Sequence, residues 1–130
     1  MSKSEALTRG IRVQVESNYL PERSDPDENQ WLFVYKVLVT NESPRAVQLL
    51  GRHWIITDSD GRVEEVKGKG VVGEQPVLEP GETFEYTSGC PLRTPFGTMQ
   101  GVYQMVVIES GEKFDAEIAP FSLSEPYAVN

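Results

Sequence analysis

One glycine pattern in the sequence has the spacing that phosphate-binding loops use. Gly68, Gly70 and Gly73 fit the pattern GxGxxG, and Lys67 and Lys69 place positive charge beside them. In dinucleotide-binding folds this spacing lets the backbone approach a pyrophosphate, which then lies at the N-terminus of a helix. These five residues are therefore the first candidates for a binding site, and the ligand that they indicate is an anion.

The surroundings of the glycine pattern argue against a dinucleotide-binding domain. Pro76 and Pro80 interrupt the chain where the required helix would run, and no βαβ unit surrounds the pattern. A glycine-rich loop between strands can still present backbone N–H groups to an anion. One hypothesis is therefore that residues 68–73 bind phosphate, pyrophosphate or a nucleotide, and the other is that only the geometry of the loop requires the glycines. The first hypothesis fails if these N–H groups are used in strand pairing.

Few other side chains could carry out catalysis or bind a metal. The chain has one histidine, His53, and one cysteine, Cys90, which together can form neither a tetrahedral zinc site nor an intramolecular disulfide. No G-x-S-x-G nucleophile elbow is present. We predict that His53 is a structural residue beside a hydrogen-bond partner and that Cys90 is a structural thiol. The sequence thus predicts no catalytic residue, no metal ligand and no cofactor, and we do not expect an enzyme.

The acidic and aromatic residues also have structural interpretations. Asp58 and Asp60 lack the spacing of a calcium-binding loop and are predicted to form a turn with Gly61. Four aromatic residues of the predicted strands are expected in the hydrophobic core before they are expected to bind a ligand: Trp31, Tyr35, Trp54 and Tyr103.

The elements that would position these residues are predicted to be strands. Apolar and polar residues alternate in several segments, turn residues separate the segments, and no window has a sustained helical period. About seven strands are predicted, near residues 11–16, 31–40, 46–57, 62–67, 83–88, 98–109 and 113–121. The second of these is apolar on both faces, which suggests a central strand covered on both sides.

This strand pattern indicates an all-β fold, an antiparallel β-sandwich of the immunoglobulin or fibronectin type III kind. We expect one domain over residues 1–130, with an ordered core at about residues 10–122 and loose tails at both ends. Long loops are expected at residues 68–73 and 89–97, where glycine and proline are frequent.

Composition restricts the possible partners and the location. The net charge of −8 opposes attraction to nucleic acid or to an anionic membrane. The N-terminal residues contain no apolar segment typical of a signal peptide, and no apolar run has the length of a membrane-spanning helix. Together with the single cysteine, these features predict a cytoplasmic protein without nucleic-acid or membrane partners.

Four segments of the sequence resemble the ApaG family. They are residues 52–58 (RHWIITD), 68–76 (GKGVVGEQP), 78–90 (LEPGETFEYTSGC) and 97–101 (GTMQG). The match extends from about residue 11 to residue 121, and the four segments are specific only when taken together.

The resemblance implies a fibronectin type III-like sandwich and a bacterial cytoplasmic protein. It also implies a link to cobalt resistance and magnesium efflux, and a gene that commonly neighbours a diadenosine tetraphosphatase. Similar domains in eukaryotic F-box proteins and in a polymerase-interacting protein look like protein-recognition modules. The family's molecular activity is undefined, so the resemblance alone gives no ligand.

Two functions are therefore expected, and we favour the first. A non-catalytic protein-interaction module would use the open strand edges of a sandwich, which can accept an extended peptide. The alternative is a phosphate-containing small molecule bound at residues 68–73. The chain is expected to be a monomer or a weak homodimer.

Overall fold

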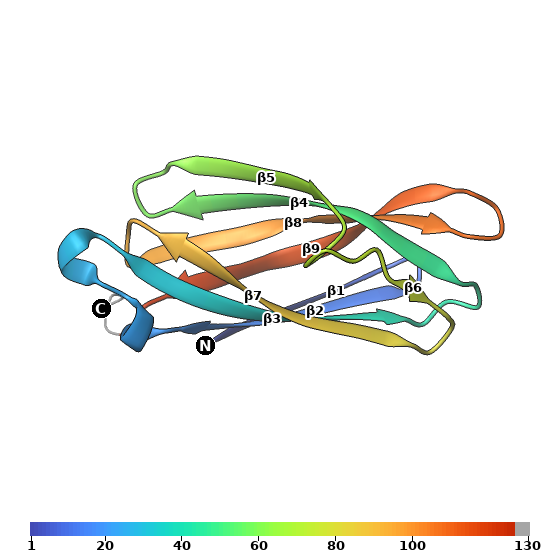
Figure 1. The fold of residues 1–130 in the computed structure, drawn as a ribbon, viewed down its shortest axis with the longest axis horizontal. Helices are drawn as coiled ribbons and strands as arrows, with labels where there is room; N and C mark the ends of the chain where they lie inside the picture. Colours follow the sequence, from blue (N-terminus) through green and yellow to red (C-terminus); the bar gives the residue numbers. More distant parts are fainter. Residues whose placement is uncertain (127–130) are drawn as a thin grey trace.

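The computed structural model describes residues 1–126, and these residues form two antiparallel β-sheets packed face to face (Figure 1). The first sheet has the strand order β1-β2-β3-β7, and the second has the order β5-β4-β8-β9, with the short strand β6 paired to β4. The described strands are β1 (Ser2–Thr8), β2 (Ile11–Tyr19), β3 (Trp31–Asn41), β4 (Val47–Asp58), β5 (Val63–Lys69), β6 (Val77–Leu78), β7 (Thr83–Leu92), β8 (Phe96–Val107) and β9 (Lys113–Ser124). The predicted antiparallel β-sandwich is confirmed, with nine strands in the described residues rather than about seven.

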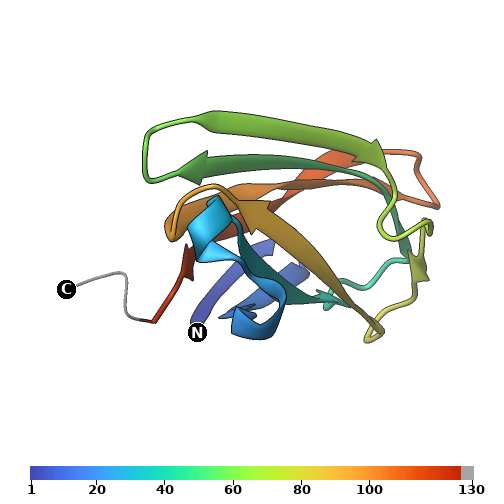
Figure 2. The same cartoon turned by 60° about the vertical axis from the view of Figure 1, so that its left-hand side comes forward.

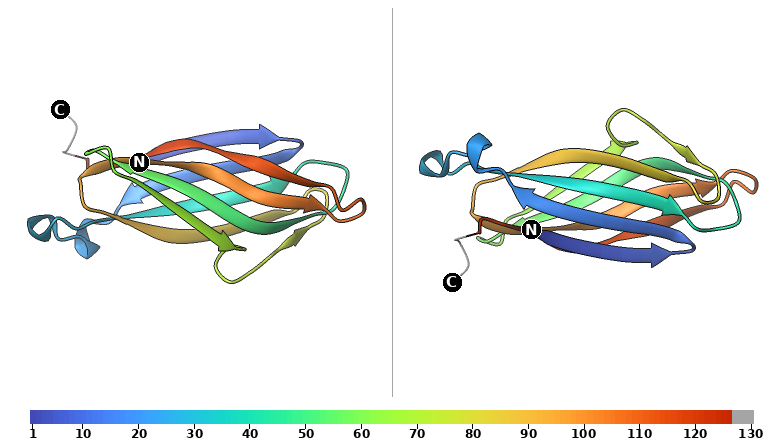
Figure 3. Two further views of the ribbon diagram at one scale, coloured as in Figure 1. Left: turned by 90° about the horizontal axis from the view of Figure 1, so that it is seen from above. Right: turned by 90° about the horizontal axis from the view of Figure 1, so that it is seen from below.

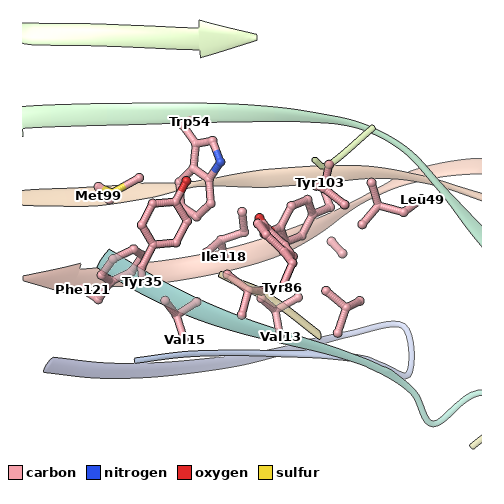
Figure 4. Close-up of a cluster of buried hydrophobic side chains, with 14 of the residues drawn as sticks. Val13, Val15, Tyr35, Leu49, Trp54, Tyr86, Met99, Tyr103, Ile118 and Phe121 are labelled. Atoms are coloured by element: carbon pink, nitrogen blue, oxygen red, sulfur yellow. The ribbon is translucent and has the colours of Figure 1, made fainter. Parts of the chain in front are cut away.

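The core lies between the sheets because alternate residues of each strand point inward. Strand β2 shows this alternation clearly, since Ile11, Val13 and Val15 are buried while the residues between them are not. An aromatic cluster fills the middle of the core, where Trp54 packs edge-on against Tyr35 and Tyr103, as Figure 4 shows. The prediction that Tyr35, Trp54 and Tyr103 are core residues is thus confirmed.

The N-terminal residues are ordered, so the prediction of a loose tail at residues 1–9 was wrong. Strand β1 pairs with β2 along its whole length, from Ser2 opposite Ser17 to Thr8 opposite Ile11. Strands β1 and β9 lie against each other and close one side of the sandwich (Figure 3). Hydrogen bonds across this side, such as the one from the Ser122 N–H to Ser2 Oγ at 3.0 Å, keep β1 in place. At the other end β9 extends to Ser124, beyond the predicted end of the core at about residue 122, and the part of the predicted tail at residues 127–130 lies outside the described residues.

Two further details differ from the sequence expectations. The long loop predicted at residues 89–97 is mostly strand, because β7 runs to Leu92 and β8 begins at Phe96. Strand β3 is central in its sheet, as predicted, but only one of its faces lies in the core. Its other face, which carries Leu32, Val34 and Leu38, is half-buried on the outside of the sandwich. Apolar residues on both faces of β3 therefore do not indicate that both faces lie in the core.

The predicted turn of Asp58 and Asp60 with Gly61 is confirmed, and a second turn and a bulge also shape the sheets. Gly61 has a φ of +85° in the turn after β4, where Asp58 Oδ1 accepts hydrogen bonds from the N–H groups of Asp60 and Arg62. The N–H of Glu82 donates to the carbonyl of Glu79 at 3.0 Å and closes the turn before β7. The pairing of β4 with β8 shifts register between Leu49 and Gly51, where one strand carries a β-bulge. Across the described residues, no helix is long and apolar enough to cross a membrane.

Candidate functional site

The first half of the glycine pattern is strand rather than loop, which corrects the prediction of a flexible segment at residues 68–73. Strand β5 continues through Gly68 to Lys69. Lys67 lies opposite His53 of β4, Gly68 opposite Arg52, and Lys69 opposite Gly51. The side chains of Lys67 and Lys69 are exposed.

The second half of the pattern is a tight turn that uses its own N–H groups. The Gly70 N–H donates to the carbonyl of Leu50 at 2.8 Å. Val71 and Glu74 exchange two backbone hydrogen bonds, each of 2.8 Å, across the turn Val72-Gly73. These N–H groups are therefore not available to an anion. Only the charges of Lys67 and Lys69 and the N–H groups of the exposed turn Val72-Gly73 could still bind a phosphate.

Each glycine of the pattern meets a structural requirement. A Cβ atom on Gly68 would lie 2.6 Å from Nη1 of Arg52, so the missing side chain leaves room for the guanidinium. That guanidinium donates to the carbonyl oxygens of Lys69 at 3.3 Å and of Gly70 at 2.8 Å. Gly70 and Gly73 have φ values of +65° and +81°, which favour glycine. This geometry accounts for all three glycines without a ligand.

His53 and Cys90 occupy the structural positions that were predicted for them. His53 Nε2 lies 2.7 Å from Glu65 Oε1 on the outer face of the β4–β5 hairpin. Cys90 is buried, and the loss of solvation raises the pKa of its thiol from 9.0 to about 12. Within residues 1–126, no three His, Cys, Asp or Glu side chains come together in an arrangement that could hold a metal ion.

Hydroxyl groups in the core pair with each other. The hydroxyls of Tyr86 and Tyr103 share a hydrogen bond between the sheets (Figure 4). Burial raises the pKa of both tyrosines above the ordinary value of 10.0. Both hydroxyls therefore stay neutral over the physiological pH range, and their hydrogen bond satisfies two polar groups within the core.

A groove of about 970 Å³ lies at the end of the sandwich where β4 ends and β5 begins. Figure 2 shows the 3-10 turns (Pro21–Arg23 and Pro26–Glu28) and β7 beside the β4–β5 hairpin at this end. Its volume falls at the upper end of the range of about 300–1,000 Å³ that ligand pockets have. Its apolar residues come from both sheets: Trp31, Leu32, Ile56, Val63, Pro91 and Leu92.

Charged side chains surround this apolar surface. Arg23, Arg62 and Arg93 line the groove, and none of them forms an ion pair within the described residues. The carboxylate of Asp58 is used by the turn after β4. Glu28 and Glu64, both exposed, are the other carboxylates in the lining. Three arginines in a chain with a net charge of −8 make this groove far less negative than the rest of the surface.

Trp31 packs against the core but also lines the groove, so the prediction that it is a core residue holds only in part. Its ring is only partly buried, and its Nε1–H donates to Glu125 Oε2 at 3.0 Å. Sequence reasoning missed the groove because its residues come from five separate segments. The available signal was an aromatic residue at the first position of a strand, directly after an exposed loop with two prolines.

The fold and the groove define a class of protein, a small antiparallel β-sandwich with one open side. The sequence pattern of the ApaG domain matches residues 21–107, which is more than half of the chain. The chain therefore belongs to the ApaG-domain family.

Similar proteins are found over almost the whole length of the chain. It is 55% identical over 122 residues to Protein ApaG of Beijerinckia indica, which covers 94% of this chain and 93% of that protein. It is 57% identical over 121 residues to Protein ApaG of Rhodopseudomonas palustris, with 93% and 92% covered. The crystal structure of the ApaA protein from Bordetella pertussis superimposes with a TM-score of 0.87 at 54% identity, covering 90% of this chain and 94% of that one.

Proposed function

We propose that the chain is a non-catalytic protein-binding module and that the groove at the end of β4 and β5 is its recognition site. The observation that carries this proposal is the combination of apolar residues from both sheets with three arginines that form no ion pair within residues 1–126. Apolar side chains with a few charged groups around them are typical of sites that bind a partner.

The expected occupant is an extended segment of a partner protein with a large apolar side chain beside a carboxylate. The apolar side chain would lie against Trp31, Ile56 and Leu92, which come from both sheets. Arg23 and Arg93 would bind the carboxylate, since guanidinium groups form bidentate hydrogen bonds with it. The open strand edge of β7 flanks the groove and offers backbone hydrogen bonds to an extended chain.

The other expectations from the sequence fit this proposal. A buried single cysteine suits a cytoplasmic protein, because no disulfide is needed. The link to cobalt and magnesium that the ApaG resemblance implies would then act through a partner protein rather than through a metal site of this chain. Neither nucleic acid nor a membrane is expected as a partner, because the surface is strongly acidic.

A displayed library of random peptides, selected on the purified protein, tests the proposal. We expect selected peptides to share an apolar residue next to an acidic one. Arg93→Glu should weaken their binding by about tenfold or more, because it places a like charge against the peptide carboxylate. Isothermal titration calorimetry of the synthesised peptides measures this change.

The matched control is Arg45→Glu, the same change at an exposed arginine in the turn between β3 and β4, at the other end of the molecule (Figure 1). This variant should bind within about twofold of the original protein, because rim charges far from a site have little effect. Equal losses in both variants would show that only net charge matters. Failure to select any peptide, or selected peptides that bind the Arg93→Glu variant unchanged, would overturn the proposal.

A further inference from the structure

Among the described residues, no strand pairs with one of the two edges of β5. It pairs with β4 on one side only and is the last strand of its sheet. Figure 3 shows β5 along the margin of that sheet. Its register with β4 is continuous from Val63 opposite Thr57 to Lys69 opposite Gly51. An edge of this length is a template for another strand.

The hydrogen bonds at both ends of β5 show which residues face outward. The Asp58 N–H donates to the Arg62 carbonyl, and the Gly70 N–H donates to the Leu50 carbonyl. In an antiparallel ladder, hydrogen-bonded residues alternate with residues whose backbone groups point the other way. Even-numbered residues of β5 therefore bond to β4. The backbone groups of Val63, Glu65, Lys67 and Lys69 point out of the sheet edge.

A second copy of β5 can pair with this edge in an antiparallel sense, and the charges select one register. Odd-numbered residues must lie opposite odd-numbered residues, because only these have outward backbone groups. If Glu65 lay opposite itself, or Lys67 opposite itself, like charges would be adjacent, which is destabilising. With the two-fold axis at Val66, each Glu65 lies opposite Lys67 of the second copy.

The same register brings a second pair of opposite charges together. Glu64 lies opposite Gly68 of the second copy, on the inner face of the sheet. Directly opposite residues have Cβ positions about 4.5–5.5 Å apart. Within one copy, a Cβ atom on Gly68 would lie 2.6 Å from Nη1 of Arg52, so this position is next to the guanidinium. The carboxylate of Glu64 would therefore reach Arg52 of the second copy, and the two Val66 side chains would meet at the axis.

The other open edge offers no such pairing. Strand β7 pairs only with β3, and its bonding to β3 makes its odd-numbered residues the outward ones. These are Thr83, Glu85, Thr87, Gly89 and Pro91. They include no basic residue to match Glu85, and Pro91 has no N–H to donate. Of these two open edges, β5 is therefore the one whose charges can pair with those of a second copy of the same strand.

We propose that the chain forms a two-fold symmetric homodimer in which β5 pairs with β5 of a second copy, centred on Val66. The dimer joins the two larger sheets into one continuous sheet. Each copy contributes one strand of seven residues to the contact, whereas stable complexes bury about 800 Å² per partner, so association is expected to be weak. The proposal goes beyond the binding function above, because the groove residues Arg23 and Arg93 lie outside the contact.

A charge exchange tests the pairing directly. Glu65→Lys and Lys67→Glu each place like charges opposite one another and should weaken dimerisation by about tenfold or more. The double variant Glu65→Lys/Lys67→Glu restores opposite charges and should return the dissociation constant to within about threefold of the original. Sedimentation velocity at protein concentrations from about 10 µM to about 1 mM measures the mass, since weak contacts need high concentration.

The circular dichroism spectrum and thermal midpoint of each variant show that it is folded. This control is needed because Glu65 also hydrogen-bonds His53. A monomeric original protein over the whole concentration range would overturn the proposal. So would single variants that dimerise as well as the original, or a folded double variant that stays monomeric. None of these results affects the test of the groove, which uses Arg93.

A disulfide between copies gives the register independently. In the proposed dimer the two Val66 residues form a non-hydrogen-bonded pair, with Cα atoms about 4.5 Å apart, which is within the range for a disulfide. Under mild oxidation, Val66→Cys should form covalent dimers at least fivefold faster than Glu65→Cys. The native Cys90 does not compete, because it is buried and its thiol stays protonated. Equal rates for the two variants would contradict this register.

Discussion

At the scale of single residues, backbone conformation explains the glycine pattern better than a ligand does. The turn after β5 has Val72 at a φ of +42° and Gly73 at +81°. Two successive positive φ values are typical of the turn type that favours Asn-Gly. Val72 is β-branched and exposed, so this conformation costs free energy without any gain from burial. The chain thus keeps a strained residue at the tip of the turn.

Replacing this valine should stabilise the protein. Val72→Asn creates the preferred Asn-Gly sequence and should raise the free energy of unfolding by about 1 kcal/mol, since a residue held in this region costs about 1–3 kcal/mol. Urea unfolding followed by tryptophan fluorescence measures the change. The control is Val77→Asn, at an exposed valine in strand β6, which should be neutral or destabilising. A loss of stability in Val72→Asn would show that the strain is compensated by contacts.

The buried thiol makes stability depend on pH in the alkaline range. Burial raises the pKa of Cys90 from 9.0 to about 12, so the unfolded chain releases this proton at a lower pH than the folded chain. The contribution is present below pH 9 and is lost as the pH rises toward 12. Between about pH 8.5 and pH 10 the free energy of unfolding should fall by about 1 kcal/mol from this group.

The variant Cys90→Ala isolates this effect, because the buried tyrosines, whose pKa values are also raised, remain in both proteins. Urea unfolding at several pH values should show a smaller alkaline decrease in the variant than in the original protein. Parallel curves for the two proteins would mean that the Cys90 thiol ionises equally in the folded and unfolded chains.

At the scale of elements, the strands could be predicted from alternation and the exceptions have physical causes. Strand β1 was missed because its inward residues are small or polar, Ser2, Ser4, Ala6 and Thr8, and give no hydrophobic period. The C-terminal part of β7 was missed because glycine and proline mark loops, although an edge strand tolerates Pro91. Neither element could be recognised without the neighbouring strand that pairs with it.

The candidate site at residues 68–73 could also be predicted only in part, because its neighbouring strand was not known. Its residues were correctly identified as unusual, but the sequence did not reveal that Gly68 lies opposite Arg52. That pairing depends on the register of β4 and β5, which the turn at Asp58 determines. The groove depends on five segments meeting in space, and its prediction was out of reach for the same reason.

A double-mutant cycle tests the role of Gly68 in the β4–β5 hairpin. Gly68→Ala places a Cβ against the Arg52 guanidinium and should lower the free energy of unfolding by about 1–2 kcal/mol, because the hydrogen bonds to Lys69 and Gly70 are disturbed. In the background Arg52→Ala the same change should be neutral or stabilising, since alanine is better than glycine within a strand. Chemical unfolding of the four proteins measures the coupling. Additive effects would mean that Gly68 serves another purpose.

At the scale of the whole molecule, both proposed contact surfaces lie on the open side of the sandwich. Strands β1 and β9 close one side, while β5 and β7 leave the other side open. The groove lies at one end of this open side, and the free edge of β5 runs along it. A binding groove and a dimer edge can therefore act side by side. In the proposed dimer, Glu64 would be drawn toward Arg52 of the second copy, which would leave the groove more positive.

The most direct test of the central claim is an NMR titration of the ¹⁵N-labelled protein with a selected peptide, and separately with inorganic pyrophosphate. The account predicts that the peptide shifts the indole N–H signal of Trp31 and the amides of Leu32, Ile56 and Leu92. The buried indole of Trp54 and the amides of residues 68–73 should stay unchanged with either ligand. Peptide-induced shifts confined to residues 68–73, or pyrophosphate shifts there that disappear in Lys67→Ala/Lys69→Ala, would contradict the groove and support an anion site instead.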